Sequence, residues 1–150
     1  SLVERHRGTG AVVNGFVSGF GYTGSMAIAS SVAHDSHHMI VVGTNHEMMA
    51  SAANRLGEVG GGVTLWKDGS EVALVELPIA GLMSDSKASE VAVKTQDIVQ
   101  AMTDCGCDLN NAYMQHTLLA LVVIPELRIS DLGLVDVNRF ELTKVISSKP

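Results

Sequence analysis

The chain has 150 residues, of which 46% are hydrophobic and 4% are aromatic, and its formal net charge at pH 7 is −6. This length suits one compact domain with an aliphatic core, so we expect residues 1–150 to form a single domain. The negative charge argues against a nucleic-acid surface and against an anionic membrane surface, because both attract clustered lysine and arginine. No apolar stretch approaches the roughly 20 residues that are needed to span a bilayer.

Apolar periodicity predicts three strands in the first third of the chain. They are Gly10–Phe20, whose glycines are typical of bends, Gly24–Ala33 and the short run Met39–Gly43. A helix is expected next, because Thr44 and Glu47 form a capping-box pattern and apolar residues then recur at helical spacing.

The middle of the chain predicts a hairpin and a second helix. Two apolar runs flank Asp68 and Gly69, a dipeptide that favours a type I′ turn because both of its residues adopt positive φ. Ser84 and Asp85 stand where the second helix is expected to begin, as its caps, and Gly106 is expected to end it.

The last third is predicted to add a buried strand at Leu118–Ile124 and a turn near residues 131–133. The expected order is therefore three strands, a helix, a hairpin, a helix and a strand. This order predicts an α+β fold, with a mixed, largely antiparallel sheet and two main helices packed against it.

The two cysteines, Cys105 and Cys107, are separated by a single residue. This spacing fits neither a disulfide framework nor a C-x-x-C metal site. A reducing, cytoplasmic location is therefore expected.

The segment from His34 to His38, His-Asp-Ser-His-His, is the densest group of reactive side chains. Residues 34 and 37 face opposite sides in an extended strand but can converge in a turn, where imidazoles suit zinc, manganese or iron. Three interpretations stay open: a solvated turn capped by Asp35 and Ser36, a substrate-contacting loop, and a metal site. A Ser-His-Asp hydrolase is disfavoured, because sequence neighbours rarely form a triad and no G-x-S-x-G elbow is present.

Two further polar pairs lie outside this segment. Helix capping alone accounts for Ser84 and Asp85. Glu126 and Arg128 lie on one side of an extended stretch, where they form either a surface ion pair or a contact with substrate or with another domain.

Four sequence blocks together resemble the carboxy-terminal domain of bacterial adenine deaminases, which belong to the amidohydrolase superfamily. In chain order they are SSVAHDSHHMIVVGTN, NRLGEVGGGVTLWKDG, ELPIAGLMSD and VIPELRISDLGLVDV. The similarity runs from about Glu4 to Asp136 at least. It implies hydrolysis of adenine to hypoxanthine and ammonia by a metal-activated water. Manganese or iron is expected to be bound by a (β/α)8 barrel, whose typical length of about 250 residues exceeds this chain.

The resemblance also suggests roles for residues of this chain. The domain is expected to cap or support the barrel active site, with His34, Asp35 and His37 as candidate catalytic residues, because imidazoles and carboxylates suit purine nitrogens. The family usually has Asn at the position of His38, so a role that needs this amide is in doubt here. The residues expected near the substrate are Ser36, His38, Ser84, Asp85, Glu126 and Arg128.

No metal ligand is expected within this chain. Its expected partners are the barrel domain, adenine and further copies of itself. The alternatives are a non-catalytic interaction or oligomerisation module and a small metal-binding domain. Metal analysis and activity measurements separate these alternatives.

Overall fold

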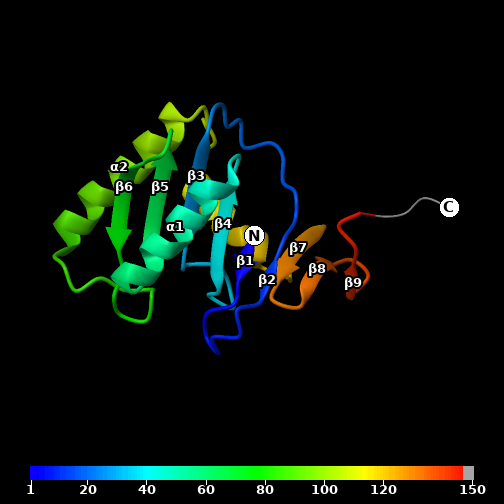
Figure 1. Ribbon diagram of the computed structural model, residues 1–150. Helices are drawn as coiled ribbons and strands as arrows, with labels where there is room; N and C mark the ends of the chain where they lie inside the picture. The colour runs from blue at the N-terminus through cyan, green and yellow to red at the C-terminus, as the bar shows by residue number, and fades with distance from the viewer. Residues whose placement is uncertain (147–150) are drawn as a thin grey trace.

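Two antiparallel sheets form the framework of the computed structural model, which describes residues 1–146 (Figure 1). The main sheet has the strand order β2-β1-β4-β3-β5-β6, and all of its neighbouring strands are antiparallel. Its strands are β1 (Leu2–Val3), β2 (Val12–Val13), β3 (Met26–Ser30), β4 (Met39–Gly43), β5 (Gly62–Lys67) and β6 (Ser70–Glu76). The small sheet consists of β7 (Leu127–Ser130), β8 (Gly133–Asp136) and β9 (Glu141–Thr143). The predicted α+β class and largely antiparallel pairing are confirmed.

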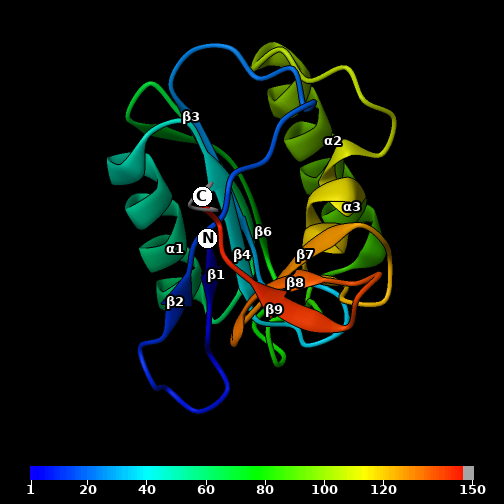
Figure 2. The same cartoon turned by 90° about the vertical axis from the view of Figure 1, so that its right-hand side faces the viewer.

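Helices cover both faces of the main sheet. The helix α1 (His46–Val59) lies on one face, whereas α2 (Ala88–Asp104) and the short α3 (Ala112–Thr117) lie on the other (Figure 2). In β3, Ala27 and Ala29 join the cluster beneath α1, and Met26 and Ile28 join the cluster beneath α2. All five residues of β3 are buried, so this strand is a continuous run of apolar and small residues with no polar face.

The first helix begins one residue later than the capping-box pattern predicts. Its N-cap is Asn45, whose side-chain oxygen accepts a hydrogen bond from the backbone N–H of Met48 at 3.1 Å. Thr44 does not cap the helix. Its hydroxyl instead donates to the carbonyl of Gly24 and accepts from the backbone N–H of Met26. The capping box of Thr44 and Glu47 is therefore wrong, but the helix and its buried stripe are confirmed: Met48, Ala52 and Leu56.

The hairpin between β5 and β6 turns at the predicted dipeptide. Asp68 has φ of 48° and Gly69 has φ of 85°, the positive values that a type I′ turn requires. The second helix ends as expected, with Cys105 as its C-cap followed by Gly106 at φ of 94°.

The start of the second helix differs from the prediction. It begins at Ala88 after the N-cap Lys87, and no side chain caps it. The hydroxyl of Ser84 instead accepts a hydrogen bond from the backbone N–H of Ser86 at 3.2 Å. Ser84 and Asp85 therefore lie in the loop before the helix and are not its caps.

Two predicted strands are wrong or shortened. Of Gly10–Phe20 only Val12 and Val13 form a strand. Leu118–Ile124 is not a strand, because Leu118–Ala120 form the 3-10 helix η1 directly after α3 and the next residues turn. A run of seven apolar residues does not by itself distinguish a strand from a helical segment.

The small sheet packs against the end of the main sheet. Ile129 of β7 is buried in one cluster with Leu2, Ala33, Ile40 and Ala120. The predicted turn near 131–133 is confirmed, because it joins β7 to β8. Among residues 1–146, no helix is long and apolar enough to cross a membrane.

Candidate functional site

The candidate site is the bend 33–38 between β3 and β4. The backbone N–H of His37 donates to the carbonyl of Ala33 at 2.7 Å, which closes a turn. Within this bend Asp35 and Ser36 are exposed, His34 and His37 are partly buried, and His38 is buried. The segment is therefore a turn whose middle residues, Asp35 and Ser36, face outward and whose two ends, Ala33 and His38, are buried.

The turn brings His34 and His37 together without completing a metal site. Their ring centroids are 5.5 Å apart in an edge-on arrangement. In the part of the chain that the structure describes, no group of three or more His, Cys, Asp or Glu side chains is arranged to hold a metal ion. Catalytic zinc sites use three protein ligands and structural sites use four, so these residues do not fit a resident metal.

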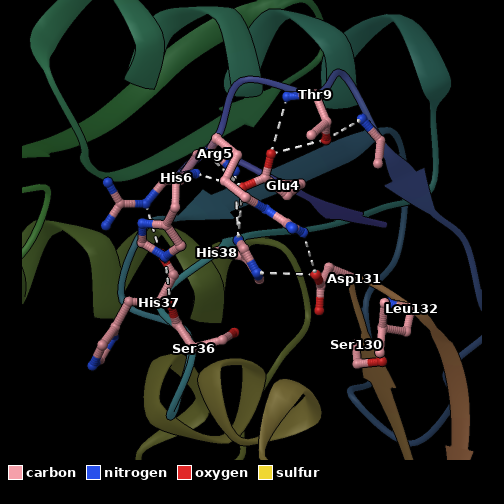
Figure 3. A network of polar contacts seen from close by, with 12 residues as sticks. Glu4, Arg5, His6, Thr9, Ser36, His37, His38, Ser130, Asp131 and Leu132 are labelled. Atoms are coloured by element: carbon pink, nitrogen blue, oxygen red, sulfur yellow. Dashed lines mark hydrogen bonds and ion pairs between the residues drawn. The ribbon is translucent and has the colours of Figure 1, made fainter.

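The bend is held by residues from the N-terminal segment. The Nε of Arg5 donates to the carbonyl of His37 at 2.6 Å, and the Nε2 of His6 donates to the carbonyl of Ser36 at 2.6 Å (Figure 3). Within residues 1–146, the side chains of Asp35 and Ser36 make no hydrogen bond to the backbone, so the self-capped turn is wrong. The bend is fixed from outside.

Strand pairing explains why the N-terminal segment meets the bend. β1 pairs with β4 in a register that places Val3 opposite Met39. Continuing this antiparallel pairing brings Glu4 and Arg5 alongside His38, and the backbone N–H of Arg5 lies 3.5 Å from its Nδ1.

Glu4 organises the turn that carries Arg5 and His6. Its side chain is buried, and its two oxygens accept hydrogen bonds from the backbone N–H groups of His6, Arg7 and Thr9 and from the Thr9 hydroxyl, at 2.7 to 3.1 Å. These bonds, led by those from the backbone of Thr9 and Arg7, lower the pKa of Glu4 to about 2. Glu4 is therefore an ionised carboxylate that fixes the 4–9 turn.

His38 lies beneath the bend between two carboxylates. Its Nδ1 is 3.9 Å from Glu4, its Nε2 is 3.8 Å from Asp131, and its ring centroid is 4.7 Å from that of His6. Burial lowers the pKa of His38, and the Asp131 carboxylate opposes this effect. Because the Arg5 N–H points at Nδ1, the neutral ring presents its Nε2–H towards Asp131.

The other predicted residues occupy two different places. Ser84 and Asp85 follow the 78–83 loop, which is tied to the bend by a hydrogen bond of 2.9 Å from Arg5 to the carbonyl of Ala80. Arg128 donates to the carbonyls of Leu127 and Pro125.

Glu126 and Arg128 do not form the ion pair that was one of the two expectations for them. Among residues 1–146, neither of the two makes a hydrogen bond or ion pair with the bend. The other expectation for them, a contact with substrate or with another domain, stays a prediction.

Sequence reasoning missed the residues that hold the bend. Glu4, Arg5 and His6 lie more than 25 positions before it, and Asp131 lies more than 90 positions after it. One signal was available: Gly8 and Gly10 follow the polar run Glu4 to Arg7. Glycine is typical of turns because it adopts positive φ without steric cost.

Comparisons with known proteins agree on one family. The family described as "Adenine deaminase C-terminal domain" matches residues 1–141. The chain is 77% identical to a protein named adenine deaminase from Ruegeria pomeroyi, over 94% of this chain and 23% of that protein. A protein of the same name from Paracoccus denitrificans is 74% identical over 97% of this chain and 24% of its own length.

A more distant relative extends the same match. The adenine deaminase of Moorella thermoacetica is 46% identical over 98% of this chain and 24% of its own length. The chain thus spans about a quarter of the length of the curated relatives that it matches.

Proposed function

Because the chain belongs to the adenine deaminase C-terminal domain family, we propose that it serves a larger enzyme that hydrolyses adenine to hypoxanthine and ammonia. The chain covers 23% to 24% of its named relatives, and the rest of their length can accommodate a (β/α)8 barrel. In this proposal the barrel binds the metal, manganese or iron. Residues 1–150 form one domain that caps its active site.

One observation supports the role of this domain: the backbone of the bend 33–38 is held by hydrogen bonds, whereas its outer side chains are free to bind. Arg5 and His6 hold two of its carbonyls at 2.6 Å. The side chains of His34 and Asp35, in contrast, make no hydrogen bond within residues 1–146. A site that binds a small molecule needs this combination, because a fixed backbone reduces the entropy lost on binding.

The chemistry of the free side chains suits a purine and the water that attacks it. A carboxylate accepts hydrogen bonds, so Asp35 can receive the N–H groups of adenine or orient a water molecule. A neutral imidazole donates with one nitrogen and accepts with the other, and burial lowers the pKa of His37, which favours its neutral form. His37 also has a buried Nδ1 without a partner in the described part of the chain, which a group from outside can satisfy.

Exposed apolar side chains lie on the 78–83 loop and next to Asp131, and they support contact of this region with another domain. Met83, in the loop tied to Arg5, is 58% exposed, and Leu132, next to Asp131, is 74% exposed. Exposed apolar groups gathered near polar ones are typical of interaction sites. We propose that the catalytic domain covers these side chains and brings its reaction centre next to His34 and Asp35.

The test is the kinetics of two variants of the full-length enzyme, Asp35→Asn and His34→Ala. We expect kcat/KM for adenine to fall about 10- to 100-fold in Asp35→Asn, because a hydrogen bond to a charged group is lost. Metal content and the unfolding temperature are expected to stay unchanged. The matched controls are Asp68→Asn, at an exposed turn, and His46→Ala, at an exposed helix start, and both should keep wild-type kinetics.

The main alternative is a non-catalytic module that only packs on the catalytic domain or joins copies of the enzyme. The same exposed apolar side chains favour it. Unchanged kcat/KM in both Asp35→Asn and His34→Ala, at unchanged metal content, decides for this alternative and against the active-site role.

The cellular setting is also part of the proposal. We place the enzyme in the cytoplasm, in the catabolism of adenine, and as a homo-oligomer. Cys105 and Cys107 support a reducing compartment, because both are buried and neither forms a disulfide.

A further inference from the structure

Arg5 contacts two loops that are far apart in the sequence. Its Nε donates to the carbonyl of His37 in the bend at 2.6 Å. Its Nη2 donates to the carbonyl of Ala80 in the 78–83 loop at 2.9 Å. One side chain therefore joins the bend that carries His34 and Asp35 to the loop that precedes Ser84 and Asp85.

The 78–83 loop fits closely around the Arg5 guanidinium. The backbone groups of Ile79 and Met83 bond to each other at 3.1 Å, and Ala80 and Gly81 have positive φ. A Cβ at Gly81 would lie 3.0 Å from two of the Arg5 nitrogens. Glycine at this position therefore lets the loop backbone approach the guanidinium.

A second hydrogen bond, which does not involve Arg5, attaches the same loop to the main sheet. The hydroxyl of Ser31, which is fully buried, donates to the carbonyl of Gly81 at 2.6 Å. It also accepts from the backbone N–H of Gly62 at 2.7 Å. Because this tie anchors the loop to the sheet without Arg5, removing Arg5 can release the loop from the bend without unfolding it.

The partners of Arg5 indicate that its role depends on where it places its donors. Within the described residues Arg5 and Arg128 form no ion pair, whereas Arg7, Arg55 and Arg139 all pair with carboxylates. Arg128 donates to carbonyls of its own chain neighbours, Leu127 and Pro125, whereas Arg5 joins two segments that are far apart in the sequence. The Arg5 guanidinium donates to the two carbonyls from two separate nitrogens, Nε and Nη2, whereas all three donors of a lysine ammonium lie on one nitrogen. Partial burial lowers the pKa of Arg5, but a guanidinium stays protonated in proteins.

We propose that Arg5 is a positioning residue that couples the 33–38 bend to the 78–83 loop, so that both present one surface to the catalytic domain. The coupling concerns only contacts within this chain, whereas its effect on catalysis rests on the proposed function. Glu4 supports the coupling indirectly, because its carboxylate fixes the turn from which the Arg5 side chain extends.

Hydrogen exchange of the full-length enzyme tests the coupling. The variant Arg5→Lys keeps the positive charge but loses the forked guanidinium. We expect backbone amide hydrogen exchange to rise about tenfold in two peptides, one covering residues 33–38 and one covering residues 78–83. His6→Ala removes a contact to the bend alone, so exchange should rise only in the peptide covering 33–38. Arg139→Lys, at an exposed ion pair, should change neither peptide.

Two outcomes overturn the coupling. One is an Arg5→Lys enzyme in which only one of the two peptides exchanges faster. The other is an enzyme in which neither peptide changes while the unfolding temperature and the Arg139→Lys control stay at their wild-type values.

The kinetic consequence is measured separately. We expect Arg5→Lys to lower kcat/KM for adenine about tenfold, mainly through a higher KM, because the bend to which we assign adenine binding is less well ordered. His6→Ala should have a smaller effect. If Asp35→Asn and His34→Ala keep full activity while both peptides loosen in Arg5→Lys, the proposed function fails and the coupling stands. If Asp35→Asn loses activity but the peptides do not respond together, the coupling fails alone.

Discussion

Two buried histidines show how different two regions of this small fold are. His116 of α3 is 1% exposed, and His38 of the bend is 6% exposed. His116 donates from Nδ1 to the carbonyl of Ala112 at 2.8 Å, and its Nε2 lies 3.0 Å from the Tyr22 hydroxyl. The Phe20 ring packs against the His116 ring, with 4.1 Å between the two ring centroids. His38 instead faces two carboxylates beneath an exposed bend.

The comparison teaches that burial does not separate a structural histidine from one that supports a site. The partners of His116 suit a neutral ring, and among residues 1–146 no carboxylate forms an ion pair with it, so burial lowers its pKa to about 4. The partners of His38 are charged, and one of them, Glu4, belongs to the 4–9 turn that carries Arg5 and His6, the residues that hold the bend. We infer that His116 stabilises the core, whereas His38 supports the bend for which we propose a functional role.

The largest expected effect on stability comes from His116→Ala. Removing a buried ring that packs against Phe20 should cost roughly 4 kcal/mol in the free energy of unfolding, measured with urea. Activity per folded molecule should not change, because the partners of His116, namely Phe20, Tyr22 and Ala112, lie outside the bend. A matched variant, His46→Ala, should stay within about 0.5 kcal/mol of wild type. A loss of kcat/KM in folded His116→Ala would break the distinction between the two histidines.

The pH dependence of stability should follow His116. Its pKa is about 4 in the folded protein and 6.5 in the reference state. The unfolded chain therefore takes up a proton first, and stability that is fully present above pH 6.5 is lost as the pH falls towards about 4. The loss amounts to roughly 3 kcal/mol. In His116→Gln this part of the pH dependence should vanish, and an unchanged curve in that variant would contradict the assignment.

Glu4→Gln sharpens the comparison from the side of the bend. The pKa of Glu4 is about 2, against a model-compound value of 4.5, so its carboxylate stabilises the fold above pH 4.5 and this stability is lost between 4.5 and about 2. We expect a lower unfolding temperature in Glu4→Gln at neutral pH and a difference from wild type that disappears in that window. Activity should fall several-fold, because the turn that carries Arg5 and His6 loosens.

The control for this variant is Glu58→Gln, at an exposed helical position. It should not reproduce either effect. A Glu4→Gln enzyme with wild-type activity and wild-type unfolding temperature at pH 7 would show that the 4–9 turn does not depend on the carboxylate.

The smallest effect is expected for Asp131→Asn. Its contacts to His38 and to the exposed side chain of Arg7 are 3.8 and 3.5 Å long, and such pairs contribute about 0.5 kcal/mol. Because the Asp131 carboxylate raises the pKa of His38, that pKa should fall further in the variant, which an NMR titration measures. A loss of kcat/KM as large as in Asp35→Asn would instead place Asp131 in the site itself.

The elements that were predictable from the sequence are those whose signals are local. Asp68 and Gly69 define their turn because their own φ values determine its type. The stripe Met48, Ala52 and Leu56 defines a helix face because its spacing is a property of the helix. The run Leu118–Ile124 failed because its apolar residues carry no periodicity, and it directly follows a helix into which its first residues continue.

The support of the candidate site was not predictable, because it depends on long-range pairing. Arg5 meets His37 only because β1 joins the sheet beside β4 in one register. If the pairing of β1 with β4 shifted by one residue, the side chains of Glu4 and Arg5 would each move to the other face of the sheet. The bend itself could be identified from its composition, whereas the residues that hold it in place could be identified only from the three-dimensional structure.

The most direct test of the central claim is a structure of the full-length enzyme with an adenine analogue bound. The account predicts that a side-chain atom of Asp35 or His34 lies within hydrogen-bond distance, about 2.6 to 3.2 Å, of the analogue or of one water bound to it. Finding the bend on an outer surface, with both side chains in bulk solvent and far from the analogue, would contradict it.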